Sequence, residues 1–129
     1  MPLPATRILD SAEILVRTLA DTLLLQAQAS VSAHGHFHLV LAGGTTPRAL
    51  YEELARRGAG DHRWHIWYGD ERCLPADHPE RNSVMAETAW LAESNIPPEQ
   101  RRPIPAERGA ESAATEYAGR LADVPSFDL

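Results

Sequence analysis

The chain has 129 residues, 43% hydrophobic and 23% charged, which is typical of one globular domain and excludes a disordered, collagen-like or membrane-embedded chain. Its formal net charge of −6 provides no excess of positive charge to neutralise a phosphate backbone, so nucleic acid is not expected as a partner. All 12 basic residues are arginines. The absence of lysine excludes Schiff-base chemistry and the lysine of a P-loop, but guanidinium groups can still bind an anion.

The sequence carries no sign of export or of membrane insertion. Cys73 is the only cysteine, so neither an internal disulfide nor a cysteine-rich zinc site is expected. No apolar run reaches the ~20 residues that a membrane span needs. The N-terminal segment MPLPATRILD lacks the apolar core of a signal peptide. We therefore expect a cytoplasmic protein with no membrane partner, and the sequence leaves its oligomeric state open.

The N-terminal part predicts a long helix followed by a buried strand. Leucines and alanines recur every third or fourth residue from about Ser11 to Ala29, and Asp10 with Glu13 resembles a capping pair at the helix start. The segment FHLVLA then reads as a short buried strand, which Gly43 and Gly44 end.

The remainder alternates helices with a second strand. Threonine, Pro47 and Gly58 predict the cap, first turn and end of a helix, and WHIWY predicts a strand stopped by Gly69. Asn82 or Ser83 is expected to cap a helix that runs to about residue 94. The rest comprises a short edge strand at Ile104 and a last helix over 111–122.

This order predicts the α/β class: a doubly wound, mostly parallel sheet with helices on both faces. In such sheets, ligands bind beyond the carboxyl ends of the strands. The loop GGTTPR after the first strand and the turn GDER after the second are therefore the segments expected to form a site.

The glycine loop can serve as an anion site. Gly43 and Gly44 permit unusual backbone conformations and a close approach to the main chain, while Thr45 and Thr46 add hydroxyls beside the free amides of a helix start. The alternative interpretation is a tight turn with no ligand. Arg48, early in the same helix, either faces the anion or is solvated and opposes the helix dipole.

The GDER turn supplies two carboxylates and a guanidinium. By alternation, Asp70 and Arg72 are the two expected to face the site, and the competing interpretation is a solvated turn with a local ion pair. Arg81 follows in a loop that can fold over the site, whereas the simpler role for Asn82 is that of a helix cap.

Three of the histidines have a spacing that a metal site can use. His34, His36 and His38 would share one face of an extended chain, but an exposed lead-in to the strand explains them more simply. We therefore expect neither a metal nor a cofactor.

Three segments together resemble the 6-phosphogluconolactonase family within the glucosamine/galactosamine-6-phosphate isomerase superfamily: LVLAGGTTPRALYEELA, WHIWYGDERCLPADHPERNSVMAETAWL and RRPIPAERGAESAATEYAGRL. The resemblance implies an NagB/RpiA-like fold and a metal-independent hydrolase that opens 6-phosphogluconolactone in the pentose phosphate pathway. Glucosamine-6-phosphate deaminases share the fold but usually carry a tyrosine where this chain has Arg72.

The resemblance also suggests residue roles. Asp70 and Arg72 match the catalytic turn, and the glycine loop from Gly43 to Thr46 matches the substrate site, to which we add Arg48 and Arg81. A sugar phosphate is the expected small-molecule partner.

One family feature is missing from this chain. The family's general base is a histidine in a Gly-His-Thr segment after a strand that begins Phe-Asp-Leu, and the sequence stops at Phe127-Asp128-Leu129. We therefore expect residues 1–129 to be a single incomplete lactonase domain, truncated within the sheet and inactive alone. The alternatives are a deaminase/isomerase-type enzyme and a non-catalytic sugar-phosphate-binding remnant.

Overall fold

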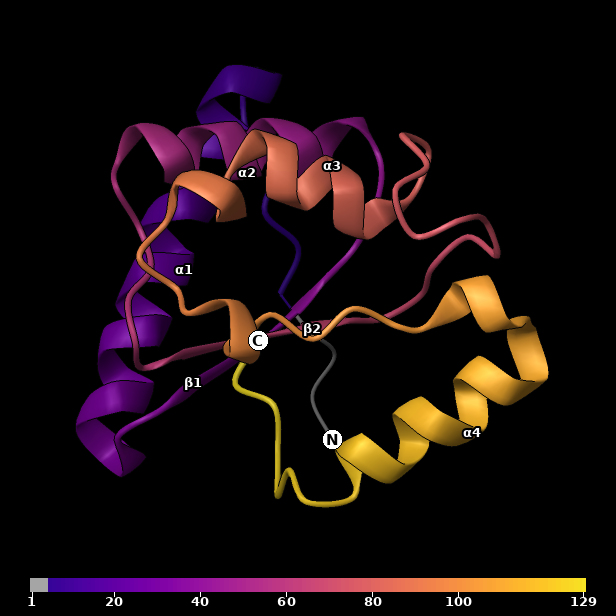
Figure 1. Ribbon diagram of the computed structural model, residues 1–129. Coiled ribbons are helices and arrows are strands. Elements are labelled where there is room, and N and C mark those ends of the chain that lie inside the picture. Colours follow the sequence, from indigo (N-terminus) through magenta and orange to yellow (C-terminus); the bar gives the residue numbers. More distant parts are fainter. Residues whose placement is uncertain (1–4) are drawn as a thin grey trace.

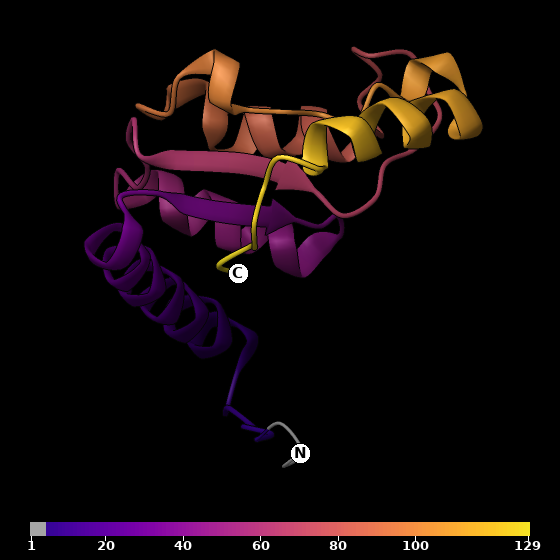
Figure 2. The same ribbon diagram turned by 90° about the horizontal axis from the view of Figure 1, so that it is seen from below.

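The computed structural model describes residues 5–129. Two strands, β1 (Phe37–Leu41) and β2 (Trp64–Tyr68), form a parallel pair with Phe37 opposite Trp64 and Leu41 opposite Tyr68 (Figures 1 and 2). Both strands thus end at the same edge of the sheet.

Segments outside the two strands extend the sheet on either side. Beyond β2, Arg101 forms a parallel bridge with Ile66. Beyond β1, the Asp128 N–H donates to the His38 carbonyl at 2.9 Å and the Val40 N–H donates to the Leu129 carbonyl at 3.0 Å. The final residues therefore run along β1.

Helices cover both faces of this sheet. Figures 1 and 2 show α1 (Ala12–His34), α2 (Thr45–Arg56) and α3 (Asn82–Ala89) on one face, with α4 (Ala110–Leu121) on the other. Short 3₁₀ helices span Leu91–Glu93, Pro98–Gln100 and Ala106–Arg108. The predicted α/β class with parallel strands is confirmed, and no helix within residues 5–129 is long and apolar enough to cross a membrane.

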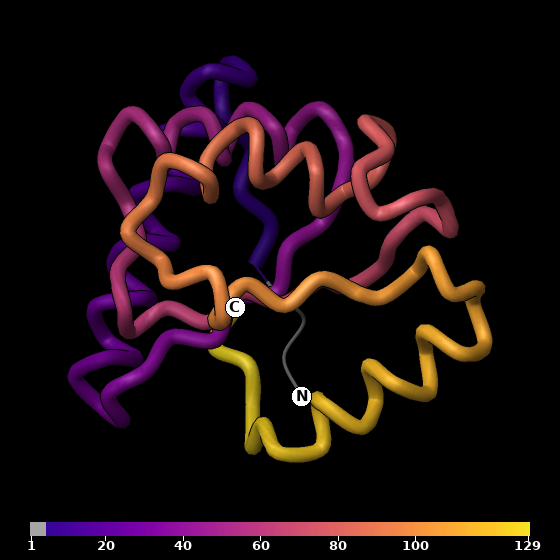
Figure 3. Tube along the Cα trace, viewed as in Figure 1, coloured from indigo at the N-terminus to yellow at the C-terminus, as the bar shows by residue number. Residues whose placement is uncertain are grey.

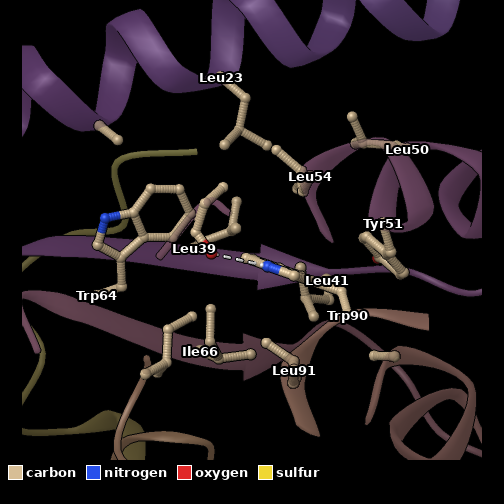
Figure 4. Packing of buried hydrophobic residues seen from close by; sticks show 14 of the residues in the cluster. Leu23, Leu39, Leu41, Leu50, Tyr51, Leu54, Trp64, Ile66, Trp90 and Leu91 are labelled. Carbon is tan, nitrogen blue, oxygen red and sulfur yellow. Dashed lines mark hydrogen bonds between the residues drawn. The ribbon is translucent and has the colours of Figure 1, made fainter. Parts of the chain in front are cut away.

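The main core lies between the sheet and the layer of α1, α2 and α3. Alternate strand residues face these helices because side chains along a strand point to opposite faces. Leu23 from α1 and Leu54 from α2 point toward the strands, and Trp90 belongs to the same buried cluster (Figure 4). The buried Trp90 indole donates its Nε1–H to the Ala59 carbonyl at 2.9 Å, so its polar atom is satisfied inside the core.

The opposite face of the sheet is anchored to α4 by one tyrosine. The Tyr117 hydroxyl donates to the Arg102 carbonyl at 2.7 Å and accepts from the Tyr68 N–H at 2.9 Å. Burial raises the pKa of Tyr117 to about 12, so the hydroxyl keeps the proton that it donates.

Several predicted helix boundaries were wrong. The Ser11 side chain, not Asp10, caps α1 by accepting from the Ile14 N–H at 3.1 Å. The same helix runs past Ala29 to His34 and ends at Gly35, where a φ of 85° favours glycine. His34 is consequently helical, which removes the predicted extended run of three histidines.

The later elements differ as well. Helix α2 begins at Thr45 with Gly44 as its N-cap, so a threonine does not serve as the cap and Pro47 lies two residues further in. Helix α3 ends at Ala89 because Trp90 leaves helical geometry with a φ of −151°. Ile104 forms no strand, and the bridge lies at Arg101 instead.

Candidate functional site

The two glycines after β1 have different roles. Gly44 has a φ of 113°, a conformation that side chains rarely adopt, and it turns the chain from the sheet into α2. Gly43 lacks a positive φ, but a Cβ added there would lie 2.7 Å from Asn82 Cγ. Gly43 is thus small because the Asn82 side chain packs against its backbone.

The turn after β2 points its middle carboxylate inward. The Glu71 side chain is 0% exposed and accepts from the backbone N–H groups of Asn82 at 2.6 Å, Ser83 at 2.9 Å and Arg72 at 2.9 Å. Burial by itself would raise the Glu71 pKa, but these backbone donors outweigh it and hold that pKa below its ordinary value. Asp70 and Arg72, on either side of Glu71 in the sequence, are exposed.

Asn82 joins the turn to the glycine loop. Its Nδ2–H donates to the Asp70 carbonyl at 3.2 Å and to Asp70 Oδ1 at 3.0 Å, while the same side chain contacts Gly43. The prediction that Asn82 or Ser83 caps α3 was wrong, because Arg81 is the N-cap residue and makes no side-chain cap. The Glu71 carboxylate binds the free amides in its place.

A pocket of about 340 Å³ opens between the two loops. Thr45 from the start of α2 and Arg72 from the turn after β2 both line it, although 27 positions separate them in sequence. Its other lining residues are Gly44, Arg48, Pro79, Glu80, Arg81, Asn82 and Met85. The segment 69–81 carries the chain from β2 around this side to α3 (Figure 3). The pocket has the size of a small-molecule site and gathers several guanidinium-bearing residues.

Only some of the predicted site residues line this pocket. Gly44, Thr45, Arg48 and Arg72 line it, whereas Gly43, Thr46 and Asp70 are not among its lining residues. Asp70 still lies next to the pocket, since Asn82 binds it and borders the cavity.

Arg81 lines the pocket, but its guanidinium is already engaged. Its side chain is 2% exposed and donates to the Leu74 carbonyl, to the Ile104 carbonyl and to Glu107. These contacts favour a supporting role for Arg81 over the direct substrate contact expected from the sequence. The buried Glu71 pairs with Arg81, and the pattern of the GDER turn alone did not predict this role.

None of the six histidines lines the pocket. On the sheet face that α4 covers, His65 Nε2 lies 3.2 Å from His36 Nδ1, and the Trp67 indole donates to His38 Nδ1 at 3.1 Å. Burial lowers the pKa of His38 and lowers that of His65 to about 4, with the neighbouring Arg102 guanidinium adding to both shifts. Within residues 5–129, no group of three or more His, Cys, Asp or Glu side chains is arranged to hold a metal ion.

Fold and pocket together define an α/β protein with an arginine-lined site at the carboxyl edge of parallel strands. A family model described as glucosamine-6-phosphate isomerases/6-phosphogluconolactonase matches residues 10–129, and the chain belongs to this family.

Individual relatives agree with that assignment. A 6-phosphogluconolactonase of Nostoc sp. is 36% identical over 96 residues, which cover 74% of this chain and 40% of the relative. One from Synechocystis sp. is 33% identical over 135 residues, covering 98% of this chain and 56% of the relative. The crystal structure of a 6-phosphogluconolactonase from Shewanella baltica superposes with a TM-score of 0.79 at 28% identity, covering 91% of this chain and 50% of that one. The chain thus spans about half the length of the relatives it matches.

Proposed function

We propose that this chain forms the sugar-phosphate pocket of an enzyme that hydrolyses 6-phosphogluconolactone to 6-phosphogluconate. The observation that carries the proposal is that Thr45 and Arg72, from loops after two different strands, line one cavity of about 340 Å³. The names of the relatives support lactone hydrolysis as the reaction of the whole protein.

The pocket has suitable groups for an anionic, hydroxyl-rich ligand. Arg48 and Arg72 supply positive charge, and the start of α2 at Thr45 supplies free amides and a hydroxyl. Glu80 is the acidic lining residue and can accept hydrogen bonds from sugar hydroxyls. Such a site binds a phosphate or carboxylate at one end and orients the sugar ring by its hydroxyls.

The reaction needs a placed water, a general base that takes a proton from it, and a stabilised oxyanion. The water oxygen adds to the lactone carbonyl carbon, the ring C–O bond breaks, and the proton that water loses ends on the former ring oxygen. Arg72 would stabilise the negative charge that develops on the carbonyl oxygen, and Asp70, held by Asn82, would orient the reacting groups.

The general base lies outside these residues in our proposal. In the family that the chain resembles, the base belongs to a Gly-His-Thr segment, and no histidine of this chain lines the pocket. Because general acid–base catalysis contributes about 10²–10⁴-fold in rate, the 129-residue chain alone is expected to bind ligand without useful turnover.

The test is calorimetric titration of the purified chain with 6-phosphogluconate, the stable product. Arg72→Gln is expected to weaken binding by about 10-fold or more, since a charge-assisted hydrogen bond contributes about 1.5–3 kcal/mol. Arg120→Gln is the matched control, because Arg120 lies on α4 and pairs with Glu116. Equal affinities for the two variants, or tighter binding of glucosamine 6-phosphate than of 6-phosphogluconate, would overturn the proposal.

A further inference from the structure

We infer that Glu71 and Arg81 are positioning residues of the pocket: a buried ion pair that fixes Arg72 and Asn82 without touching the ligand. The inference rests on the proposed function in that the ligand of this pocket is taken to be a phosphorylated sugar acid. It assigns Arg81 a different role from the direct contact expected from its place in the sequence.

The first observation is that Glu71 caps a helix to which it does not belong. Helix α3 has no side-chain cap of its own, yet its first two amides donate to the Glu71 carboxylate from 11 and 12 positions away. The free amides of a helix start attract a negative charge, and this one is fully buried. The carboxylate therefore joins the turn after β2 to the first turn of α3.

The second observation is the set of contacts made by Arg81. Its Nε lies 3.4 Å from Glu71 Oε2 and has no hydrogen-bond partner among residues 5–129. Its two terminal nitrogens donate to the Leu74 and Ile104 carbonyls and to Glu107. A guanidinium suits this place because its planar fork can serve several fixed acceptors at once. Arg81 thus ties the turn to the segment that leads into α4.

These contacts act on two residues that line the pocket. The Arg72 N–H and the Asn82 N–H both donate to Glu71 Oε1, at 2.9 Å and 2.6 Å. One oxygen atom therefore sets the separation of the two backbones that carry these side chains. Loss of this carboxylate would leave the charge of Arg72 unchanged but would release its position relative to Thr45.

Glu71→Gln tests the inference with little change in shape. The amide replaces one acceptor oxygen by an NH₂ group, which then faces an N–H donor of α3 or of Arg72. We expect the affinity for 6-phosphogluconate to fall at least 10-fold, and the Asn82 and Ser83 amides to exchange hydrogen faster. Helical circular dichroism should persist.

A destabilised control separates positioning from a general loss of stability. Leu23→Ala creates a cavity between α1 and the sheet at a residue that does not line the pocket, and it should lower the melting temperature while leaving the affinity of the folded chain unchanged. Arg81→Ala adds a rescue test: millimolar guanidinium can occupy the vacated space and should restore part of the affinity. The same concentration of guanidinium should leave the affinity of Leu23→Ala unchanged.

Glu107→Gln is the milder second variant should Glu71→Gln fail to fold. The Glu107 side chain is 37% exposed and binds Arg81 through one oxygen at 2.9 Å, so a two- to five-fold loss of affinity is expected. Wild-type affinity in both Glu71→Gln and Glu107→Gln would overturn the inference, as would unchanged hydrogen exchange at Asn82 and Ser83. Absence of 6-phosphogluconate binding by the wild-type chain would instead refute the proposed function, and the exchange measurement would still decide the role of Glu71.

Discussion

Replacing Gly43 by alanine tests the packing that joins the two loops of the site. A Cβ at this position would lie 2.7 Å from Asn82 Cγ, closer than any normal contact, so the Asn82 side chain must move. The displaced amide can no longer donate to both the carbonyl and the carboxylate of Asp70. The substitution should therefore disturb the turn after β2 as well as the glycine loop.

The magnitude follows from these contacts. Overpacking lowers the free energy of unfolding by about 1–3 kcal/mol. Each lost hydrogen bond lowers it by about a further 0.5–1.5 kcal/mol when the remaining donor or acceptor finds no other partner. The exposed Asp70 regains water, so we expect a total of about 2–4 kcal/mol in the free energy of unfolding. At about 4 °C per kcal/mol for a domain of this size, the melting temperature should fall by roughly 8–16 °C.

The assay is thermal and urea unfolding of the wild type, of the single variants Gly43→Ala, Gly119→Ala and Asn82→Ala, and of the double variant Gly43→Ala/Asn82→Ala. Gly119→Ala is the control, since no atom of the described part of the chain, residues 5–129, lies within 4 Å of its Cβ position in α4 and alanine is the better helix former. Asn82→Ala removes the obstacle, so Gly43→Ala should be almost neutral in that background. A similar cost of Gly43→Ala with and without the Asn82 side chain would refute the steric argument.

Three further predictions concern the rest of the fold. Burial lowers the pKa of His65 to about 4 from 6.5, so the unfolded chain binds more protons than the folded chain between these two pH values. The contribution of His65 to stability should therefore be complete above pH 6.5 and fall as the pH drops toward 4. His65→Phe should flatten this part of a profile of melting temperature against pH. Tyr117→Phe leaves the buried Tyr68 N–H without an acceptor and should cost about 1–3 kcal/mol in urea unfolding, whereas a cost below 0.5 kcal/mol would mean that another group accepts this bond. Ser11→Ala removes the cap of α1 and should cost about 1 kcal/mol, with Ser11→Asp retaining most of the wild-type stability.

The strands and their order could be predicted because their signal is local. Each strand is a short apolar run ended by glycine, and a parallel pair joined by a helix places both carboxyl ends at one edge. That rule was sufficient to predict that Thr45 and Arg72 lie near each other. The pocket lies between these two loops because both follow parallel strands that end at the same edge of the sheet.

Helix limits were less predictable because competing signals are similar in strength. Asp10 and Ser11 are both good caps, and only the geometry of the first turn selects Ser11. The polar stretch after Ala29 lacks a strong apolar repeat, but Gly35 supplies the left-handed residue at which α1 ends. The helix therefore extends as far as a suitable C-cap permits.

Neighbouring residues in the sequence could not predict that Glu71 is the buried, supporting residue of the GDER turn. Alternation separates Glu71 from Asp70 and Arg72, but the reason for burying a carboxylate lies 11 residues later, in amides that α3 leaves free. A buried charge is tolerated only with several partners, and Glu71 acquires three backbone donors and a guanidinium once the segment 69–81 has folded back. The same folding places Arg72 beside the start of α2. The backbone of the turn that points the Glu71 carboxylate inward therefore also points the Arg72 guanidinium outward. This explains why the pocket residue Arg72 and its supporting residue Glu71 are adjacent in the sequence.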